Sequence, residues 1–126
     1  MGRFSQLLIA CALAGGLLAS GHAIAHAQAD DTEQGIASFY SDAFQGAATA
    51  SGEPFDQQAL TAAHPSLPLG TMVLVTRPDT GQEVEVLIND RGPYVQGRII
   101  DLSKRAARKL GMINRGTVPV MVTQVN

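Results

Sequence analysis

An aspartate at the end of an apolar segment is the residue of this chain best placed to do chemistry. Asp90 follows the segment 83–89, stands next to Arg91 and comes just before the turn pair Gly92-Pro93. A carboxylate held rigidly at a strand end, beside a permanent cation, is typical of sites that move protons or bind polar substrates. The sequence therefore predicts a functional role for Asp90, with a structural turn as the alternative.

Four further side chains are candidates for the same site. Glu53 lies in the glycine-rich loop 45–54, Asp56 follows it by three residues, and His64 is the single histidine after residue 27. Asp101 ends a second strand, and carboxylates at strand ends around a small barrel can converge on one mouth. Each has a structural alternative. Glu53 would be a solvated loop acid and Asp56 a turn cap. His64 would be a structural hydrogen-bonding residue, and Asp101 would form an ion pair with Arg98. We favour the structural alternative for Asp56 and Asp101.

Several other kinds of site are poorly supported by this sequence. One histidine and no cysteine after residue 27 cannot assemble the usual zinc sites. No Gly-x-Ser-x-Gly motif marks a serine nucleophile, and no glycine-rich loop precedes a helix to bind phosphate. The basic residues form no stripe for nucleic acid. We therefore predict no metal, no cofactor and no nucleic-acid partner.

Carboxylate chemistry of this kind points to sugars. Cleavage of a glycosidic bond needs a carboxylic acid that protonates the leaving oxygen and a site that stabilises an oxocarbenium-like centre. Aromatic rings that could stack on sugar faces are few, and tryptophan is absent. The candidates, of which Tyr40 and Tyr94 are the polar members, are Phe39, Tyr40, Phe44, Phe55 and Tyr94.

The elements that must position these residues are short strands separated by glycine, proline and aspartate. Segments 36–40, 71–77, 83–88 and 118–125 have strand character, and Pro78-Asp79-Thr80-Gly81 predicts a hairpin turn. One convincing helix spans 103–110, with Ser103 as its cap and Gly111 at its end. This combination, in under 100 residues, predicts a compact, mainly β barrel with one short helix.

The first part of the chain is predicted to be a cleavable signal peptide over residues 1–27. Arg3 precedes an apolar run that is too short to span a bilayer, and small-x-small patterns follow it. The run Leu8-Ile9-Ala10-Cys11 matches a lipoprotein box, but its position makes lipid anchoring at Cys11 the less favoured alternative. Residues 28–34 read as a flexible lead-in and 35–126 as one domain. The exported chain has a formal charge of −3 and no cysteine for a disulfide.

Six motifs follow one another along the chain: Gly35-x-Ala37-Ser38-x-Tyr40, Thr49-Ala50-x-Gly52-Glu53-x-Phe55-Asp56, Leu60-Thr61-Ala62-Ala63-His64, Leu67-Pro68-x-Gly70-Thr71, Asn89-Asp90-Arg91-Gly92-Pro93 and Arg98-x-x-Asp101-Leu102-Ser103-x-x-Ala106. Together and in this order they closely resemble the RlpA (rare lipoprotein A) family of bacterial cell-envelope proteins. The resemblance implies a six-stranded double-psi β-barrel, an architecture shared with expansins. It also implies a lytic transglycosylase of the periplasm or cell envelope that cuts peptidoglycan glycan strands stripped of stem peptides.

Carried over by motif, the family's important positions fall on Glu53, Asp56, His64 and Asp90. Asp90 would first protonate the oxygen between N-acetylmuramic acid and N-acetylglucosamine, and then accept the proton of the muramic acid 6-hydroxyl as a 1,6-anhydro ring closes. Glu53 and His64 would orient the sugar or tune Asp90, and Asp56 and Arg91 would support the site. Glycan strands and division or cell-wall proteins are the implied partners, whereas the SPOR domain of many relatives is not found in this sequence. The alternatives are a non-catalytic, expansin-like wall-binding module and a hydrolase that uses two carboxylates and water.

Overall fold

The computed structural model describes residues 32–125 of this chain. The signal peptide predicted for 1–27, the lipid anchor considered at Cys11 and residues 28–31 of the lead-in therefore lie outside the described residues. Within residues 32–125, no helix is long and apolar enough to cross a membrane.

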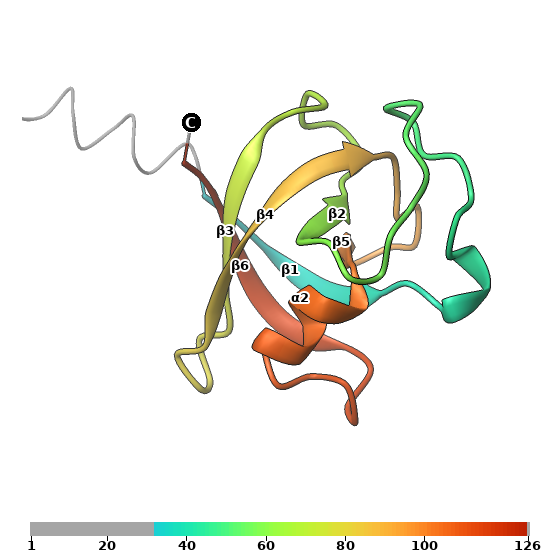
Figure 1. Ribbon diagram of the computed structural model, residues 1–126. Helices are drawn as coiled ribbons and strands as arrows, with labels where there is room; N and C mark the ends of the chain where they lie inside the picture. The colour runs from blue at the N-terminus through green and yellow to red at the C-terminus, as the bar shows by residue number, and fades with distance from the viewer. Residues whose placement is uncertain (1–31, 126) are drawn as a thin grey trace, which may run out of the picture. The chain divides into compact units, whose positions relative to one another are not determined.

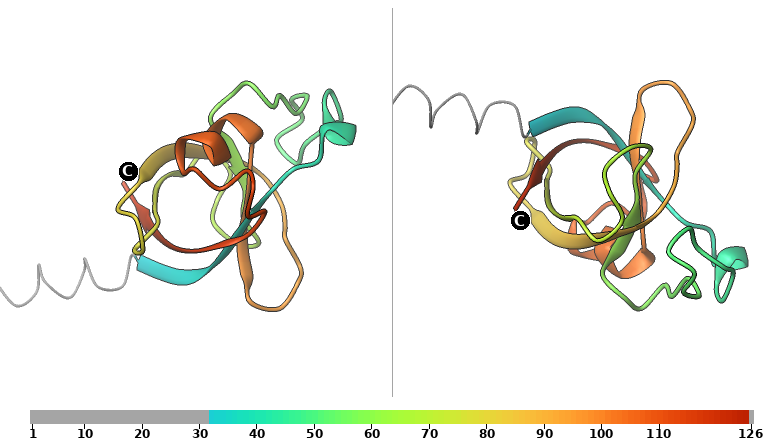
Figure 2. Two further views of the ribbon diagram at one scale, coloured as in Figure 1. Left: turned by 90° about the horizontal axis from the view of Figure 1, so that it is seen from below. Right: turned by 90° about the horizontal axis from the view of Figure 1, so that it is seen from above.

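Six strands close into a barrel, which Figure 1 shows from the side and Figure 2 shows end-on. A 3-10 turn and one α-helix complete the described part, so the predicted six-stranded barrel with one short helix is confirmed. Around the barrel the order is β1-β5-β2-β4-β3-β6. The elements are β1 (Thr32–Phe39), η1 (Asp42–Phe44), β2 (Thr61–Ala63), β3 (Met72–Thr76), β4 (Glu83–Asp90), β5 (Arg98–Leu102), α2 (Lys104–Lys109) and β6 (Val118–Gln124).

The barrel mixes parallel and antiparallel pairs. β1 pairs with β5 in parallel, and β2 pairs with β4 in parallel, whereas the other neighbours are antiparallel. Parallel neighbours require long crossovers. β1 and β2 are separated by β5 in the barrel, and the long connection between them carries η1 and the loop 45–60, which form a lobe beside the barrel (Figure 1).

The barrel interior is filled by β-branched side chains that alternate with exposed ones. In β4, Val84, Val86 and Ile88 are buried while the intervening residues are exposed, which is the period-two pattern of a strand with one face inward. β3 and β6 contribute five more buried valines, and α2 covers one end with Ala106, Ala107 and its C-cap residue Leu110. Burying one such valine or isoleucine contributes about 1.5–3 kcal/mol before the cost of ordering the chain.

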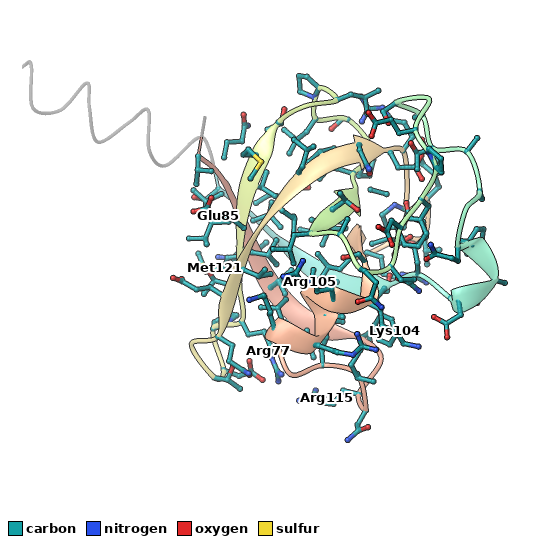
Figure 3. All side chains as sticks on the ribbon, in the orientation of Figure 1. Arg77, Glu85, Lys104, Arg105, Arg115 and Met121 are labelled. Atoms are coloured by element: carbon teal, nitrogen blue, oxygen red, sulfur yellow. The ribbon has the colours of Figure 1, made fainter. Side chains whose placement is uncertain are left out.

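Local sequence signals for the turns and the helix were reliable. The Ser103 hydroxyl accepts a hydrogen bond from the Ala106 amide, as its predicted capping role requires. Gly111, just after α2, has φ of 64°, and Gly81 has φ of 80° in the hairpin turn. At this hairpin, Arg77 and Arg115 lie at the same end of the molecule (Figure 3), and both pair with Asp79.

The flexible lead-in predicted for 28–34 is wrong over its last three residues. β1 begins at Thr32, because Thr32, Glu33 and Gln34 pair in an antiparallel register with Thr123, Val122 and Met121 of β6. The polar composition of this segment indicated a loop. It is a strand because β6 supplies a continuous row of backbone hydrogen-bond partners.

Candidate active site

Strand register places two candidate site residues, Asp90 and Asp101, in one row of paired residues. Ser38 of β1 is paired with Asp101 of β5, Asp101 with Ala63 of β2, and Ala63 with Asp90 of β4. The row therefore crosses four neighbouring strands near one end of the barrel. This register brings Asp90 and Asp101 to the same mouth, as the sequence predicted for carboxylates at strand ends.

The Asp90 carboxylate accepts three hydrogen bonds. Its Oδ1 receives the backbone amides of Ala50 and Arg91, at 2.8 and 2.9 Å. Its Oδ2 receives the hydroxyl of Tyr40, at 2.6 Å. Two lone pairs on each oxygen leave Oδ1 saturated and Oδ2 with one free acceptor position. Any further proton exchange at Asp90 therefore involves Oδ2.

Tyr40 is held in place by two other aromatic rings. It stacks on the buried Phe55 with ring centroids 4.0 Å apart, and Phe44 meets it edge-on at 5.8 Å. Burial and the hydrogen bond to the Asp90 carboxylate raise the pKa of Tyr40 well above its ordinary value. The hydroxyl is thus neutral and able to donate to Asp90 throughout the physiological range.

A groove of about 630 Å³ opens over Asp90. Two of its wall residues are strongly exposed aromatics, Tyr94 at 78% and Phe44 at 51%, which is the arrangement expected where a sugar face is to be stacked. The other walls of the groove include two aspartates and two arginines, so charges of both signs lie in the same groove as these rings. The lining residues are Phe39, Tyr40, Ser41, Phe44, Ala47, Ala48, Asp90, Arg91, Gly92, Pro93, Tyr94, Arg98 and Asp101.

Asp101 is engaged by Arg98, as predicted. Arg98 Nη2 lies 3.2 Å from Asp101 Oδ1, and the buried Ser38 hydroxyl is hydrogen-bonded to both residues. These three side chains form a closed polar cluster in the groove wall. Asp101 is therefore the ion-pair partner of Arg98. Among the described residues, Asp90, the other carboxylate in the groove wall, has no ion pair.

His64 lies close to Asp90 through its backbone, while its ring is engaged elsewhere. Its amide donates to the Asp90 carbonyl oxygen at 3.1 Å. Nδ1 of the buried ring accepts from the amides of Ser66 and Leu67, which places the proton of the neutral ring on Nε2, 2.8 Å from Glu33 Oε1. Both ring nitrogens are thus occupied by groups other than Asp90.

Glu53 and Asp56 belong to the lobe and lie outside the walls of the Asp90 groove. Glu53 lines a neighbouring hollow of about 310 Å³, together with Ser51, Thr61, Asn89 and others. Asp56 Oδ1 accepts the Gln58 amide at 2.9 Å, so this carboxylate caps a turn, the alternative favoured from sequence.

The structure adds contributors that sequence reasoning missed. The Ala50 amide reaches Asp90 because the turn 49–53, with Gly52 at φ of 92°, is fastened to β4 by a hydrogen bond from the Ser51 amide to the Asn89 carbonyl. A backbone donor has no signature of its own, although the Thr49-Ala50-x-Gly52 motif marked this turn. Glu33, the partner of His64, lay in the segment taken for a lead-in. Among residues 32–125, no three His, Cys, Asp or Glu side chains are grouped to hold a metal ion.

Known proteins are similar to this chain over most of the residues that the structure describes. The family model DPBB_1, described as lytic transglycolase, matches residues 32–122. A probable endolytic peptidoglycan transglycosylase RlpA of Nostoc sp. is 58% identical over 91 residues, which cover 71% of this chain and 24% of that protein. The endolytic peptidoglycan transglycosylase RlpA of Campylobacter jejuni is 51% identical over 90 residues, or 71% of this chain and 33% of that protein. The chain thus spans a third or less of the length of these two relatives.

A solved structure shares the barrel. The apo expansin of Clavibacter michiganensis has a TM-score of 0.59 and 30% sequence identity, and the match covers 75% of this chain and 50% of that chain. The similarity extends over most of the residues that the structure describes and includes the barrel that carries the groove.

Proposed function

Because this chain belongs to the RlpA family of double-psi β-barrel lytic transglycosylases, we propose that it cleaves the glycan strands of peptidoglycan. The cut falls between N-acetylmuramic acid and N-acetylglucosamine, within strands stripped of stem peptides, and leaves a 1,6-anhydro end. Export to the periplasm or cell envelope, where this polymer lies, belongs to the same proposal.

One observation carries the proposed mechanism: in an aromatic-edged groove, the carboxylate of Asp90 has no ion pair within residues 32–125 and keeps one free acceptor position on Oδ2. A glycosidase that uses water needs two separate carboxyl groups, one as acid and one as base or nucleophile. In this groove the second carboxylate, Asp101, is bound by Arg98 and Ser38. One group that acts twice therefore suits the site better than two groups that act together.

The reaction balances with Asp90 alone as the proton carrier. Asp90 Oδ2 gives its proton to the glycosidic oxygen as the bond from C1 of the muramic acid breaks. The 6-hydroxyl oxygen of the same sugar then bonds to C1, and its proton returns to Asp90 Oδ2. No water is consumed, and the acid is regenerated for the next cleavage.

The hydroxyl of Tyr40 suits both states of Asp90. The phenol donates to one lone pair of Oδ2, and the proton of the acid form occupies the free position on the same oxygen, from which it can reach the glycosidic oxygen. The 2.6 Å contact to Oδ2 can therefore persist when Asp90 gains or loses its proton. Tyr40 is thus proposed as a positioning residue for Asp90.

The other predicted residues have supporting roles in this proposal. Tyr94 stacks on a sugar ring at the rim of the groove. Glu53 contacts the part of the glycan strand that extends from the groove into the neighbouring hollow. His64 holds the end of β2 against Asp90 through its backbone, and Asp56 shapes the turn that follows Phe55. The contacts and exposures described above support these proposed roles.

A second candidate is a wall-binding module that holds glycan without cutting it. The structural similarity to an expansin and the exposed aromatic rings favour this alternative. The two candidates differ only in whether Asp90 exchanges a proton with bound glycan.

One experiment separates these functions. Purified protein is incubated with peptide-free glycan strands, and the products are examined by mass spectrometry. Anhydro-muramic ends support the transglycosylase, reducing ends indicate a hydrolase, and binding without products leaves the wall-binding module. Asp90→Asn is the control: it should abolish cleavage while the protein still folds and binds, and full activity of this variant would refute the role of Asp90.

A further inference from the structure

Arg91 presents a guanidinium without a counter-ion in the wall of the groove. Among residues 32–125, no carboxylate lies within ion-pair distance of its side chain, although the residue is half-buried. The other cation of the groove, Arg98, is paired with Asp101. Removing a cation partly from water is unfavourable unless an anion compensates for it, so Arg91 is the group of this groove best suited to receive one from a ligand.

The carboxylates of the groove are already in use. Asp90 takes its three hydrogen bonds from Tyr40 and from two backbone amides. Asp101 is bound by Arg98 and Ser38. An incoming anion at Arg91 therefore displaces no existing ion pair.

The guanidinium of Arg91 is also oriented. Its Nη1 donates to the carbonyl oxygen of His64 at 3.1 Å, and among the described residues no hydrogen bond occupies its Nε or Nη2. Nε and Nη2 form the edge of an arginine that binds a carboxylate through two parallel hydrogen bonds. Arg91 and Asp90 line the same groove, so a ligand bound to this edge would share that groove with the proposed catalytic group.

We propose that Arg91 binds the free lactyl carboxylate of N-acetylmuramic acid and thereby selects glycan strands whose stem peptides have been removed. This inference rests on the proposed function, because it assumes that peptidoglycan strands enter the groove. In a stripped strand the lactyl group ends in a carboxylate. In a strand with stem peptides the same carbon is an amide, which carries no charge and continues into a chain that the edge of Arg91 has no means to bind.

The test measures binding, so that it does not depend on cleavage. Asp90→Asn protein, which should not turn over its ligand, is titrated by calorimetry with two tetrasaccharides of alternating N-acetylglucosamine and N-acetylmuramic acid. One carries free lactyl carboxylates and the other carries their methylamides. We expect the carboxylate form to bind about five- to tenfold more tightly, as for a partly exposed bidentate ion pair.

Three further variants, each made in the Asp90→Asn background, test whether Arg91 causes this difference in affinity. Arg91→Gln should bind both tetrasaccharides equally, and Arg91→Lys should keep part of the preference because it retains the charge without the planar edge. Arg105→Gln is the matched control: it also loses a guanidinium that donates through Nη1 to a carbonyl, that of Gln58, but Arg105 lies on α2 outside the groove walls (Figure 3). Its preference should be unchanged. Thermal unfolding of each variant verifies that it is folded.

The inference is overturned if folded Arg91→Gln protein retains the preference, or if the carboxylate and methylamide forms bind equally from the start. The proposed function fails in a different way, when wild-type protein forms no anhydro ends from stripped strands. Selection by Arg91 can therefore fail while cleavage stands, and a lactyl preference in the absence of cleavage would assign Arg91 to a wall-binding module.

Discussion

The hydroxyl of Tyr40 donates a hydrogen bond to Asp90 Oδ2 across 2.6 Å, although the two residues are 50 positions apart in the sequence. The phenol ring stacks on Phe55 and meets Phe44 edge-on, so the hydroxyl has a defined position from which to hold the carboxylate. This contact joins the aromatic cluster of Tyr40, Phe44 and Phe55 to the end of β4. It is the relationship on which the proposed proton transfer most directly depends.

Tyr40→Phe should impair catalysis more than stability. The ring remains stacked on Phe55, and the loss of one hydrogen bond should lower the free energy of unfolding by no more than about 1.5 kcal/mol. We expect kcat/KM to fall by about ten- to hundredfold, because a preorganised donor beside the reacting group is lost.

The measurement is kcat/KM with stripped glycan strands, compared with the melting temperature of the same variant. A folded Tyr40→Phe protein with the kcat/KM of the wild type would contradict a positioning role for Tyr40.

Tyr94→Ala should weaken substrate binding without affecting the fold. The side chain is 78% exposed and lines the groove, so it contributes little to the core but offers a face to a sugar ring. We expect KM to rise several-fold, with kcat and the melting temperature nearly unchanged. Val95→Ala, at 52% exposure on the same loop but outside the groove walls, is the control and should leave KM unaltered.

His64 substitutions distinguish a structural strut from a proton carrier. His64→Ala leaves the amides of Ser66 and Leu67 without their acceptor and should cost about 2–3 kcal/mol of stability. In His64→Asn the side-chain oxygen can replace Nδ1 as acceptor, so much of the stability and activity should return. If the asparagine variant is well folded but inactive, the imidazole itself takes part in the reaction.

Acid should weaken the end of the barrel that holds the β3–β4 hairpin. The hydrogen bond from Arg77 lowers the pKa of Asp79 below its ordinary value of 3.8. Since the folded-state pKa is the lower one, the stabilisation is present above pH 3.8 and disappears as pH falls through the lowered value. Asp79→Asn should therefore be less stable than the wild type at neutral pH, with a difference that vanishes in strong acid.

Thermal unfolding at neutral pH and at several values below pH 3.8 measures this effect. Asp42→Asn is a useful comparison, because the hydrogen bond from Lys104 lowers the pKa of Asp42 in the same direction. Arg77 is buried and Lys104 is half-buried, so the loss of Asp79 should matter more at neutral pH. Equal effects of the two substitutions would contradict this reasoning.

Features with local causes could be predicted from the sequence. The Pro78–Gly81 turn, the Ser103 cap and the alternation of β4 depend on neighbours within a few residues, and all three are present. β2 escaped prediction because Thr61–Ala63 is short and two of its three residues are alanine, which is a weak strand former. It is a strand because β4 and β5 supply backbone partners on both sides.

The sequence by itself determined that the chain forms a small β-barrel and that Asp90 ends a strand before a sharp turn, because strand periodicity and turn chemistry are written in adjacent residues. Only the tertiary structure decided what surrounds that carboxylate. Tyr40, the Ala50 amide and the row from Ser38 to Asp90 meet through strand order and register, and Glu33 reaches His64 from the first strand. Such contacts join residues tens of positions apart, and closure of the barrel brings them together.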